Sequence, residues 1–345
     1  MFTNINISMS NFLLITVILF TNYTPAFSEI LFQDNFDNSP DWRSNQTVNK
    51  GAGGHDISWG NSRADKCTTH CPPEGWTSYR APSSHWKDDR RKDTFILDST
   101  GARGDTGKGI TYNIEVTGWF GTWSGGSLDL WLGENGYDEL YVRYYLKYDI
   151  EWQWSTPQDT QHSYQKLVRI STFNDNIWTT TENPQYYGSN SYNVPVFFPD
   201  WNHNYGLKKT YFLMSTRLAP DYTIGPNGDF RNGPEPKIGV WQCYEFYVKM
   251  NSANGAADGI YRTWLDGKLV AEAMNVEWKQ ADSDTSHNWN WLMLLDNTTN
   301  ASAPLADHKE ITVYMDDVVV STKRIGPTPD DTNSKRQIML KTPSF

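Results

Sequence analysis

The segment from Leu140 to Tyr148 (LYVRYYLKY) constrains the fold most, because its side chains alternate with the period of a β-strand. A second strand is expected at residues 165–170 (QKLVRI), where Lys166, Val168 and Ile170 share one face and Arg169 lies on the other. Strands that place Lys or Arg beside Tyr are costly as pure core. We therefore interpret these two strands as the floor of a groove that binds polar, anionic ligands.

The rest of the chain predicts further strands and no extended helix. Asp266-Gly267, between two alternating runs, is typical of a hairpin turn, since a type I′ turn needs positive φ. Residues 38–92 and 173–209 are rich in polar and turn-forming residues and are expected to form long loops. Many strands without intervening helices predict an all-β fold, an antiparallel β-sandwich in one domain over residues 29–326. The other expected strands cover residues 30–36, 94–98, 109–116, 128–131, 211–217, 240–251, 259–265, 268–271, 289–295 and 311–320.

The two ends of the chain are expected to lie outside this domain. An apolar run (FLLITVILF) precedes Ala26-Phe27-Ser28, so residues 1–28 are interpreted as a signal peptide and the protein as secreted, extracellular or periplasmic. A buried core segment is the alternative for the apolar run. Residues 327–345 are polar and lack periodicity, which predicts a disordered C-terminal tail. No later stretch is apolar enough to cross a membrane, and a monomer is expected.

Charge and aromatic content narrow the class of ligand. The formal net charge of −10 argues against a nucleic acid partner, because phosphate binding needs a basic surface. It does not exclude an acidic polysaccharide if the groove itself is locally basic. Aromatic residues make up 14% of the chain, with 16 Trp and 19 Tyr. Such rings stack well on sugars, although they also serve as filler in large β-sandwiches.

Cysteine spacing leaves two interpretations open. In an exported chain, three cysteines (Cys67, Cys71 and Cys243) predict one disulfide and one free thiol. The alternative is that Cys67, His70 and Cys71 begin a zinc site, although no second ligand pair at suitable spacing is evident.

Acidic residues near the two terminal strands predict a structural Ca²⁺ site. Asp316 and Asp317 lie in the last expected strand, and Asp34 and Asp37 lie in and just after the first. Carboxylates from both strands could coordinate calcium and hold the strands together. Ordinary carboxylates at strand ends are the alternative. The metal ligands predicted here are Asp34, Asp37 and Asp317.

Four segments of the chain carry a family resemblance. They are YVRYYLKY (141–148), QKL (165–167), GVW (239–241) with YVKMN (247–251) and DGIYRTWLDGK (258–268), and VYMDDVVVS (313–321). Their order resembles the concanavalin A-like jelly rolls, and within them the polysaccharide lyases related to alginate, glucuronan and heparin lyases. The resemblance implies a jelly-roll fold and binding of an acidic polysaccharide or oligosaccharide. The hairpin motif of the third segment is shared with lectin-like domains, so it supports the fold more than an activity.

The resemblance also implies the residues of a catalytic site. Cleavage of a uronic acid polymer needs a group that neutralises the C5 carboxylate, together with a base and an acid for proton transfer. Lys166, Ser215 and Arg217 match the cleft-lining residues of the alginate lyases. Those enzymes have a Tyr-x-Tyr pair shortly after Ser-x-Arg, whereas here only Tyr222 follows nearby. The proton-transfer groups are therefore sought among Tyr211, Tyr222, His162, His203 and His287.

The sequence leaves three functions open. The first is a lyase that cleaves an acidic polysaccharide by β-elimination, and the second is a non-catalytic, lectin-like protein that binds carbohydrate in the same groove. The third is an adhesion protein. A glycoside hydrolase would show a strand of paired carboxylates, and none is found. Substrate contacts are predicted from Arg143, Tyr145, Arg169, Tyr261, Trp264 and Trp289.

Overall fold

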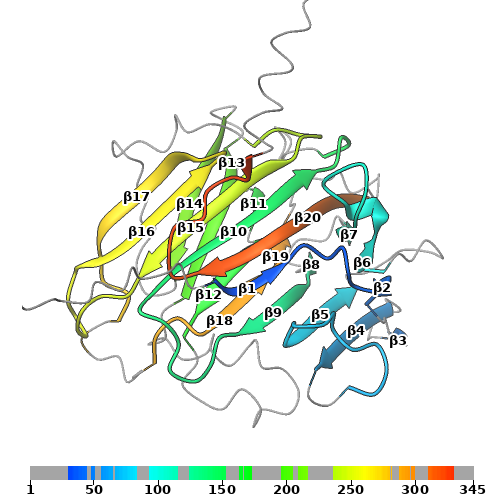
Figure 1. Ribbon diagram of the computed structural model, residues 1–345, viewed down its shortest axis with the longest axis horizontal. Helices are drawn as coiled ribbons and strands as arrows, with labels where there is room; N and C mark the ends of the chain where they lie inside the picture. Colours follow the sequence, from blue (N-terminus) through cyan, green and yellow to red (C-terminus); the bar gives the residue numbers. More distant parts are fainter. Residues whose placement is uncertain are drawn as a thin grey trace, which may run out of the picture.

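In the computed structural model the protein is a sandwich of two antiparallel β-sheets, with one sheet in front of the other (Figure 1). This confirms the predicted all-β, antiparallel sandwich. The structure describes residues 30–44, 48–50, 56–64, 67–83, 93–115, 124–152, 163–165, 167–172, 196–204, 209–216, 236–279, 281, 287–295, 297–299 and 310–329.

The front sheet, called sheet A, has nine strands in the described chain. Its centre is β10, whose alternating sequence was the strongest strand signal. A short helix, η1 (Ser99–Gly101), follows β6. The order across the sheet is β17 (Lys268–Val276), β16 (Gly259–Leu265), β15 (Gln242–Lys249), β10 (Glu139–Tyr148), β20 (Glu310–Ser321), β7 (Gly109–Glu115), β6 (Phe95–Asp98) and β2 (Trp42–Arg43), with β1 (Ile30–Asp34) paired to β20.

The rear sheet, called sheet B, has eleven strands in the described chain. Its order is β3 (Val48–Lys50), β4 (Asp56–Arg63), β5 (Ser78–Ser83), β9 (Ser127–Trp131), β18 (Trp291–Leu294), β12 (Val168–Ser171), β13 (Val196–Asn204), β11 (Ser163–Gln165), β19 (Asn297–Thr299) and β8 (Ser124–Gly125), with β14 (Lys209–Thr216) paired to β13. Strands β2 to β5 and β13 lie where long loops were predicted, so that expectation was wrong. Gly, Ser, Pro and Asn hide the alternation there, and pairing with neighbouring strands overrides the weak local preference.

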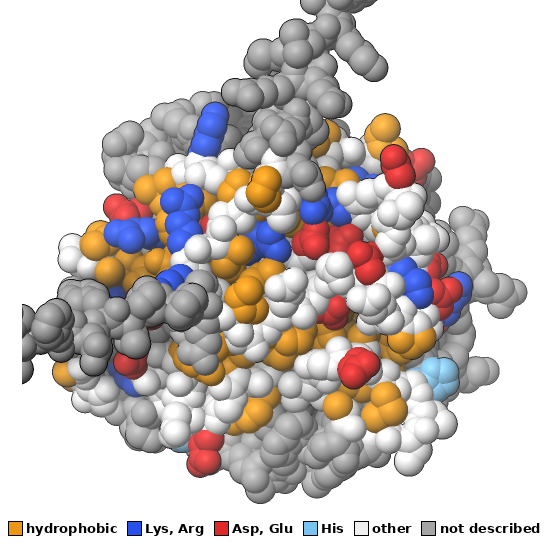
Figure 2. Space-filling view, in the orientation of Figure 1, with side chains coloured by type: hydrophobic (Ala, Val, Ile, Leu, Met, Phe, Trp, Pro, Cys, Tyr) orange, Lys and Arg blue, Asp and Glu red, His pale blue; other side chains and the backbone are white. Residues whose placement is uncertain are grey.

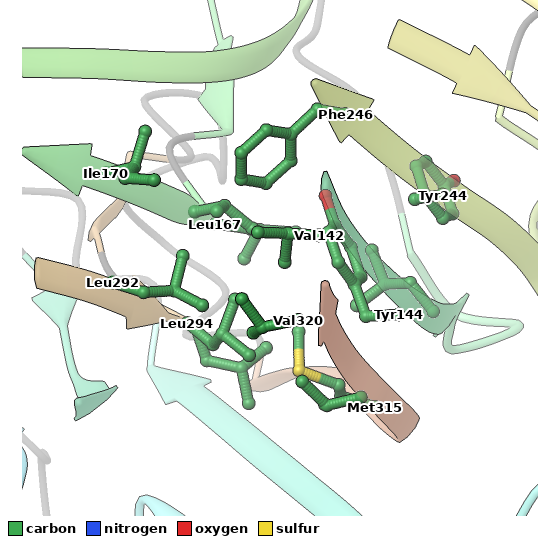
Figure 3. Packing of buried hydrophobic residues seen from close by; sticks show 14 of the residues in the cluster. Val142, Tyr144, Leu167, Ile170, Tyr244, Phe246, Leu292, Leu294, Met315 and Val320 are labelled. Carbon is green, nitrogen blue, oxygen red and sulfur yellow. The ribbon is translucent and has the colours of Figure 1, made fainter. Parts of the chain in front are cut away.

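The hydrophobic core fills the space between the two sheets. Val142 of β10 and Phe246 of β15 point toward Leu167 and Leu292 of sheet B, as Figure 3 shows. These side chains come from alternate positions of their strands, which is why one face of each sheet is apolar. Leu167 and Val168 are consecutive but both belong to the core, so the regular alternation predicted for residues 165–170 breaks between them.

A β-bulge in β20 places two carboxylates together. Asp316 pairs with Tyr145 and Val319 with Arg143, so one extra residue is accommodated between them, and Asp317 adopts a positive φ of 50°. The bulge keeps Val318 and Val320 directed to the core while Asp316 remains on the other face. The predicted hairpin turn is also confirmed, since Asp266 and Gly267 both have positive φ.

Residues 322–329 form a strap that turns back from the end of β20 over sheet A, seen as the red trace in Figure 1. Both carboxylate oxygens of Glu245 accept its backbone N–H groups, from Ile325 at 2.8 Å and Gly326 at 3.1 Å. Residues 327–329, which were predicted to begin a disordered tail, belong to this strap, and Thr328 is also hydrogen-bonded to the sheet. Residues 330–345 and the predicted signal peptide lie outside the described residues.

The cysteine prediction is confirmed in its first form. Cys67 and Cys71 form a disulfide, and Cys243 is a free, buried thiol. A zinc site at Cys67 is thereby excluded in this state, because a disulfide sulfur is not a thiolate ligand.

Candidate functional site

Three of the predicted substrate contacts lie on the outer face of sheet A, which points away from sheet B. Arg143 and Tyr145 alternate with the core residues of β10, and Trp264 lies on the same face of β16. Their exposures are only 6%, 1% and 7%, so little of them is open to a polymer. The groove predicted from the Arg and Tyr residues of β10 is not an open surface.

The cations of this outer face are matched by acidic and aromatic partners. Arg103 forms an ion pair with Asp317 and lies 3.9 Å from the ring centroid of Tyr145. Arg262 pairs with Glu272. Figure 2, which views this face, shows basic, acidic and apolar side chains interspersed over the strands. Its charge is thus largely neutralised within the protein, which disfavours recruitment of a polyanion here.

Two further predicted contacts are core residues. Tyr261 and Trp289 are 1% and 0% exposed and belong to the hydrophobic cluster between the sheets. The prediction that these two rings stack on a sugar is therefore wrong, because neither ring face can contact a ligand unless the core opens. The indole ring of Trp289 instead packs edge-on against Trp278, with 5.2 Å between the ring centroids.

The remaining predicted contact, Arg169, lies on the outer face of sheet B. Val168 and Ile170, its neighbours in β12, belong to the core, so the Arg169 side chain projects to the opposite face. In the register of the sheet, Arg169 is opposite Met293 of β18, and Met293 is opposite Asp129 of β9. Arg169 is half-buried. It lies on sheet B, whereas Arg143 lies on sheet A, which the strap crosses.

The backbone of sheet B also gathers strands that carry the predicted catalytic residues. β13 pairs with β12 on one side and with β14 on the other, so β12 and β14 are two strand spacings apart, about 10 Å. In β14, Ser215 is opposite Phe198 and Tyr211 is opposite Asn202. His203 lies in β13 opposite Thr210. Four predicted catalytic residues lie outside the described residues: Lys166, Arg217, Tyr222 and His162.

His287 lies away from this row of strands, close to the turn before β10. Its Nδ1 is 2.5 Å from the backbone carbonyl oxygen of Glu134. This contact favours a structural role for the imidazole in joining two loops.

The carboxylates predicted to bind Ca²⁺ are engaged by protein donors. Asp34 accepts hydrogen bonds from Trp76 Nε1 at 2.8 Å and from the backbone of Phe36, and burial raises the pKa of its carboxyl. Asp317 accepts from Arg103 Nε at 2.7 Å.

Asp37 makes contacts of its own with different donors. Its carboxylate accepts from the backbone N–H of Lys108 and from the Asn35 amide, both at 2.9 Å. Within the described part of the chain, no three His, Cys, Asp or Glu side chains are grouped so that they could hold a metal. Asp34, Asp37 and Asp317 therefore do not fit a calcium site.

Sequence reasoning missed the aromatic residues next to Arg169. Trp131 and Trp291, from adjacent strands, form a second hydrophobic cluster with Met293, separate from the main core. The SLDLW sequence of β9 could have indicated this cluster. Leu128 and Leu130 lie on the core face of the strand, so Asp129 and Trp131 lie on the other face.

Comparisons with known proteins concern the fold. No protein-family model matches the chain, and no curated protein matches it. The structure is similar to an endo-β-1,4-glucuronan lyase from the fungus Trichoderma reesei, with 13% identity and a TM-score of 0.43 over 72% of this chain and 92% of that chain. It is also similar to a PL-14 alginate lyase from Aplysia kurodai, with 9% identity and a TM-score of 0.44 over 69% of this chain and 89% of that one.

A third similar structure is an alginate lyase in complex with an alginate tetrasaccharide, with 11% identity and a TM-score of 0.46 over 86% of this chain and 98% of that one. All three are polysaccharide lyases. Among the residues that the structure describes, none forms a helix with the length and apolar character needed to cross a membrane.

Proposed function

We propose that this protein is an exported polysaccharide lyase that cleaves an acidic, uronic acid-containing polysaccharide on the outer face of sheet B. The observation that carries the proposal is the placement of β12 and β14 in one sheet, separated only by β13. Arg169 on β12 and Ser215 on β14 thereby come within reach of adjacent sugars of one chain. The motif resemblance adds Lys166 and Arg217, which flank the same two strands in sequence.

The proposed reaction is a β-elimination. A base removes the proton from C5, the C4–O4 bond breaks, a C4=C5 double bond forms, and an acid protonates the departing O4. Cations beside the C5 carboxylate stabilise the negative charge that develops on it, and this electrostatic effect is the main contribution of Lys166 and Arg217. Tyr211 is four residues from Ser215 in β14, so the two residues are on the same face of that strand, and Tyr211 is the candidate proton-transfer group within it.

The test is the ultraviolet absorbance of the unsaturated product on a panel of uronic acid polymers that includes alginate, glucuronan and heparin. The wild-type protein is expected to release product from at least one of them. Lys166→Met and Arg217→Met are expected to abolish release. Arg262→Met is the matched control, because it removes an arginine from the outer face of sheet A. Absence of product from the whole panel, with a folded protein, would contradict the proposal.

A second function is favoured by the departure from the alginate lyase pattern. A single tyrosine, Tyr222, follows Ser215 where those enzymes have a Tyr-x-Tyr pair. A protein that retained the cationic and aromatic groove residues but lacked a proton-transfer group would bind acidic glycans without cleaving them. Binding of a uronic acid polymer with no product, unchanged by Tyr211→Phe but weakened by Arg169→Met, would establish this lectin-like function instead.

A further inference from the structure

The outer face of sheet B carries an aromatic cluster that the core does not require. Trp291 and Met293 are each 1% exposed and lie on the strand beside Trp131, which is partly exposed. The ring centroids of Trp131 and Trp291 are 6.0 Å apart with a tilt of 54°. An outward sheet face is ordinarily polar, so a partly open indole on an apolar base indicates a surface on which a ligand can stack.

The partly exposed side chains of this face narrow the chemistry of the ligand. Asp129 and Ser171, beside Met293 and Trp291 in register, are 0% and 4% exposed, and the Asp129 carboxylate accepts a hydrogen bond from Ser78 Oγ at 2.7 Å. The partly exposed members of these two register rows are Trp131 and Arg169. A partly exposed indole near a guanidinium suits an acidic sugar, which has an apolar C–H face and a carboxylate. It suits an apolar peptide or a lipid surface less well.

The backbone that carries the indole is also held in place. The backbone N–H of Trp131 donates to Thr77 Oγ1 at 2.8 Å, and the Asp129 carbonyl accepts from the backbone of Thr77. These bonds fasten the end of β9 to the segment before β5, and the ring itself packs against Trp291. A residue with a fixed backbone and a packed ring loses less conformational freedom when a ligand binds.

The position of Trp131 relates it to the proposed cleavage site. It is opposite Trp291, which is opposite Ser171, two residues along β12 from Arg169. Two strand spacings and two residues place the Cα atoms of Trp131 and Arg169 roughly 12 Å apart. Ser215 lies on the other side of Arg169, about 10 Å away across β13. The three residues therefore follow a line that crosses the strands and is longer than one sugar ring.

We propose that Trp131, packed beside Trp291, is a distal subsite that stacks on a sugar of the acidic chain bound by Arg169. The inference rests on the proposed function, since it assumes that the ligand is an acidic glycan crossing sheet B. The proposed subsite makes the binding affinity depend on the length of the oligosaccharide. A disaccharide bound at Arg169 and β14 does not reach the indole, whereas a tetrasaccharide or longer chain does.

The experiment measures the dissociation constant of the full chain for uronic acid oligosaccharides from disaccharide to hexasaccharide by calorimetry. Wild-type affinity is expected to rise steeply once the oligosaccharide is long enough to reach Trp131. Trp131→Ala is expected to weaken binding of the longer oligosaccharides by about tenfold or more, the change for loss of one stacking contact. Its affinity for the disaccharide is expected to be unchanged. Trp131→Phe, which keeps a ring, is expected to retain most of the length dependence.

Trp241→Ala is the matched control, because Trp241 is also partly exposed but lies beside Lys147 on sheet A. Equal affinities of wild type and a folded Trp131→Ala variant for every length would overturn the subsite and leave the lyase proposal intact. Length-dependent binding without product would support the subsite and contradict the lyase. Failure of wild type to bind any uronic acid oligosaccharide would overturn both.

Discussion

The backbone N–H of Thr328 donates a hydrogen bond to the hydroxyl oxygen of Tyr145, with 2.8 Å between the two atoms. The Thr328 hydroxyl lies 3.1 Å from the same oxygen. Tyr145 thus anchors the strap to β10, and its ring also packs beneath the guanidinium of Arg103. These contacts explain why a tyrosine expected to bind substrate is almost fully buried.

Removal of the Tyr145 hydroxyl is expected to loosen the strap. Tyr145→Phe keeps the ring but loses both contacts to Thr328, which should lower the free energy of unfolding by about 1–2 kcal/mol. The measurement is the urea midpoint at unchanged m-value. Thr328→Ala retains the backbone donor and is expected to cost less than Tyr145→Phe. An identical midpoint for Tyr145→Phe and wild type would show that the strap contributes nothing through this hydroxyl.

Deletion of the strap is expected to destabilise the domain, whereas deletion of the residues beyond it is not. A chain ended after Ser321 removes the two N–H donors of Glu245, whose side chain is 1% exposed. The loss of hydrogen bonds to a buried carboxylate should cost about 1–3 kcal/mol. A chain ended after Pro329 keeps these donors and should unfold within about 0.5 kcal/mol of wild type. Equal stability of both truncated chains would contradict a structural role of the strap.

Stability is expected to depend on the protonation of Asp316. Burial raises the pKa of its carboxyl to about 7, even though the backbone N–H of Arg103 and that of Asp317 act in the opposite direction. The folded state therefore binds this proton more tightly than the unfolded chain, in which the pKa is about 3.9. The stability that this group contributes is fully present below about pH 4 and is lost as the pH rises to about 7.

The measurement is the free energy of unfolding in urea across this pH range for wild type and Asp316→Asn. The amide does not titrate, so the free energy of unfolding of the variant should lack the decrease that the titration of Asp316 causes in wild type. Asp98→Asn is the control, since Asp98 is half-buried and caps η1 through Thr100 N at 2.8 Å. Parallel pH profiles for wild type and Asp316→Asn would contradict the prediction.

Truncation of a side chain between the sheets is expected to cost much more than truncation on the surface. Phe246→Ala removes a ring that is 1% exposed and packs between sheets A and B, so it should lower the free energy of unfolding by about 3–5 kcal/mol. Met274→Ala, at 43% exposure on β17, should stay within about 0.5 kcal/mol of wild type. Denaturant unfolding of both variants tests the predicted arrangement of the core, and similar costs for the two would contradict it.

Local sequence patterns predicted the elements that depend on local physics. The alternation in β10 and the Asp266-Gly267 turn follow from backbone conformation, and one disulfide with one free thiol follows from three cysteines in a chain expected to be exported. The same patterns failed for β4 and β13, whose polar sequences show no clear alternation and which are held in the sheet by pairing with β5 and β14. Pairing of that kind is a tertiary effect that a short window of sequence does not contain.

Which face of β10 points outward could not be predicted, because both faces carry tyrosines. Tyr144 stacks on Tyr244 in the core, while Tyr141 stacks on Tyr247 on the outer face. The partners that neutralise the outer cations are also distant in sequence, as Arg103 and Asp317 illustrate. A Lys or Arg beside a Tyr in one strand therefore does not by itself indicate an anion-binding groove.

The strap has a practical consequence for attaching this protein to other molecules. Because Thr328 is bound to Tyr145 on sheet A, the strap lies on the side of the domain opposite Arg169 and Trp131. An affinity handle, a solid support or a second protein joined directly to Pro329 would start from that side. Immobilisation at that position would leave the outer face of sheet B turned toward the solution.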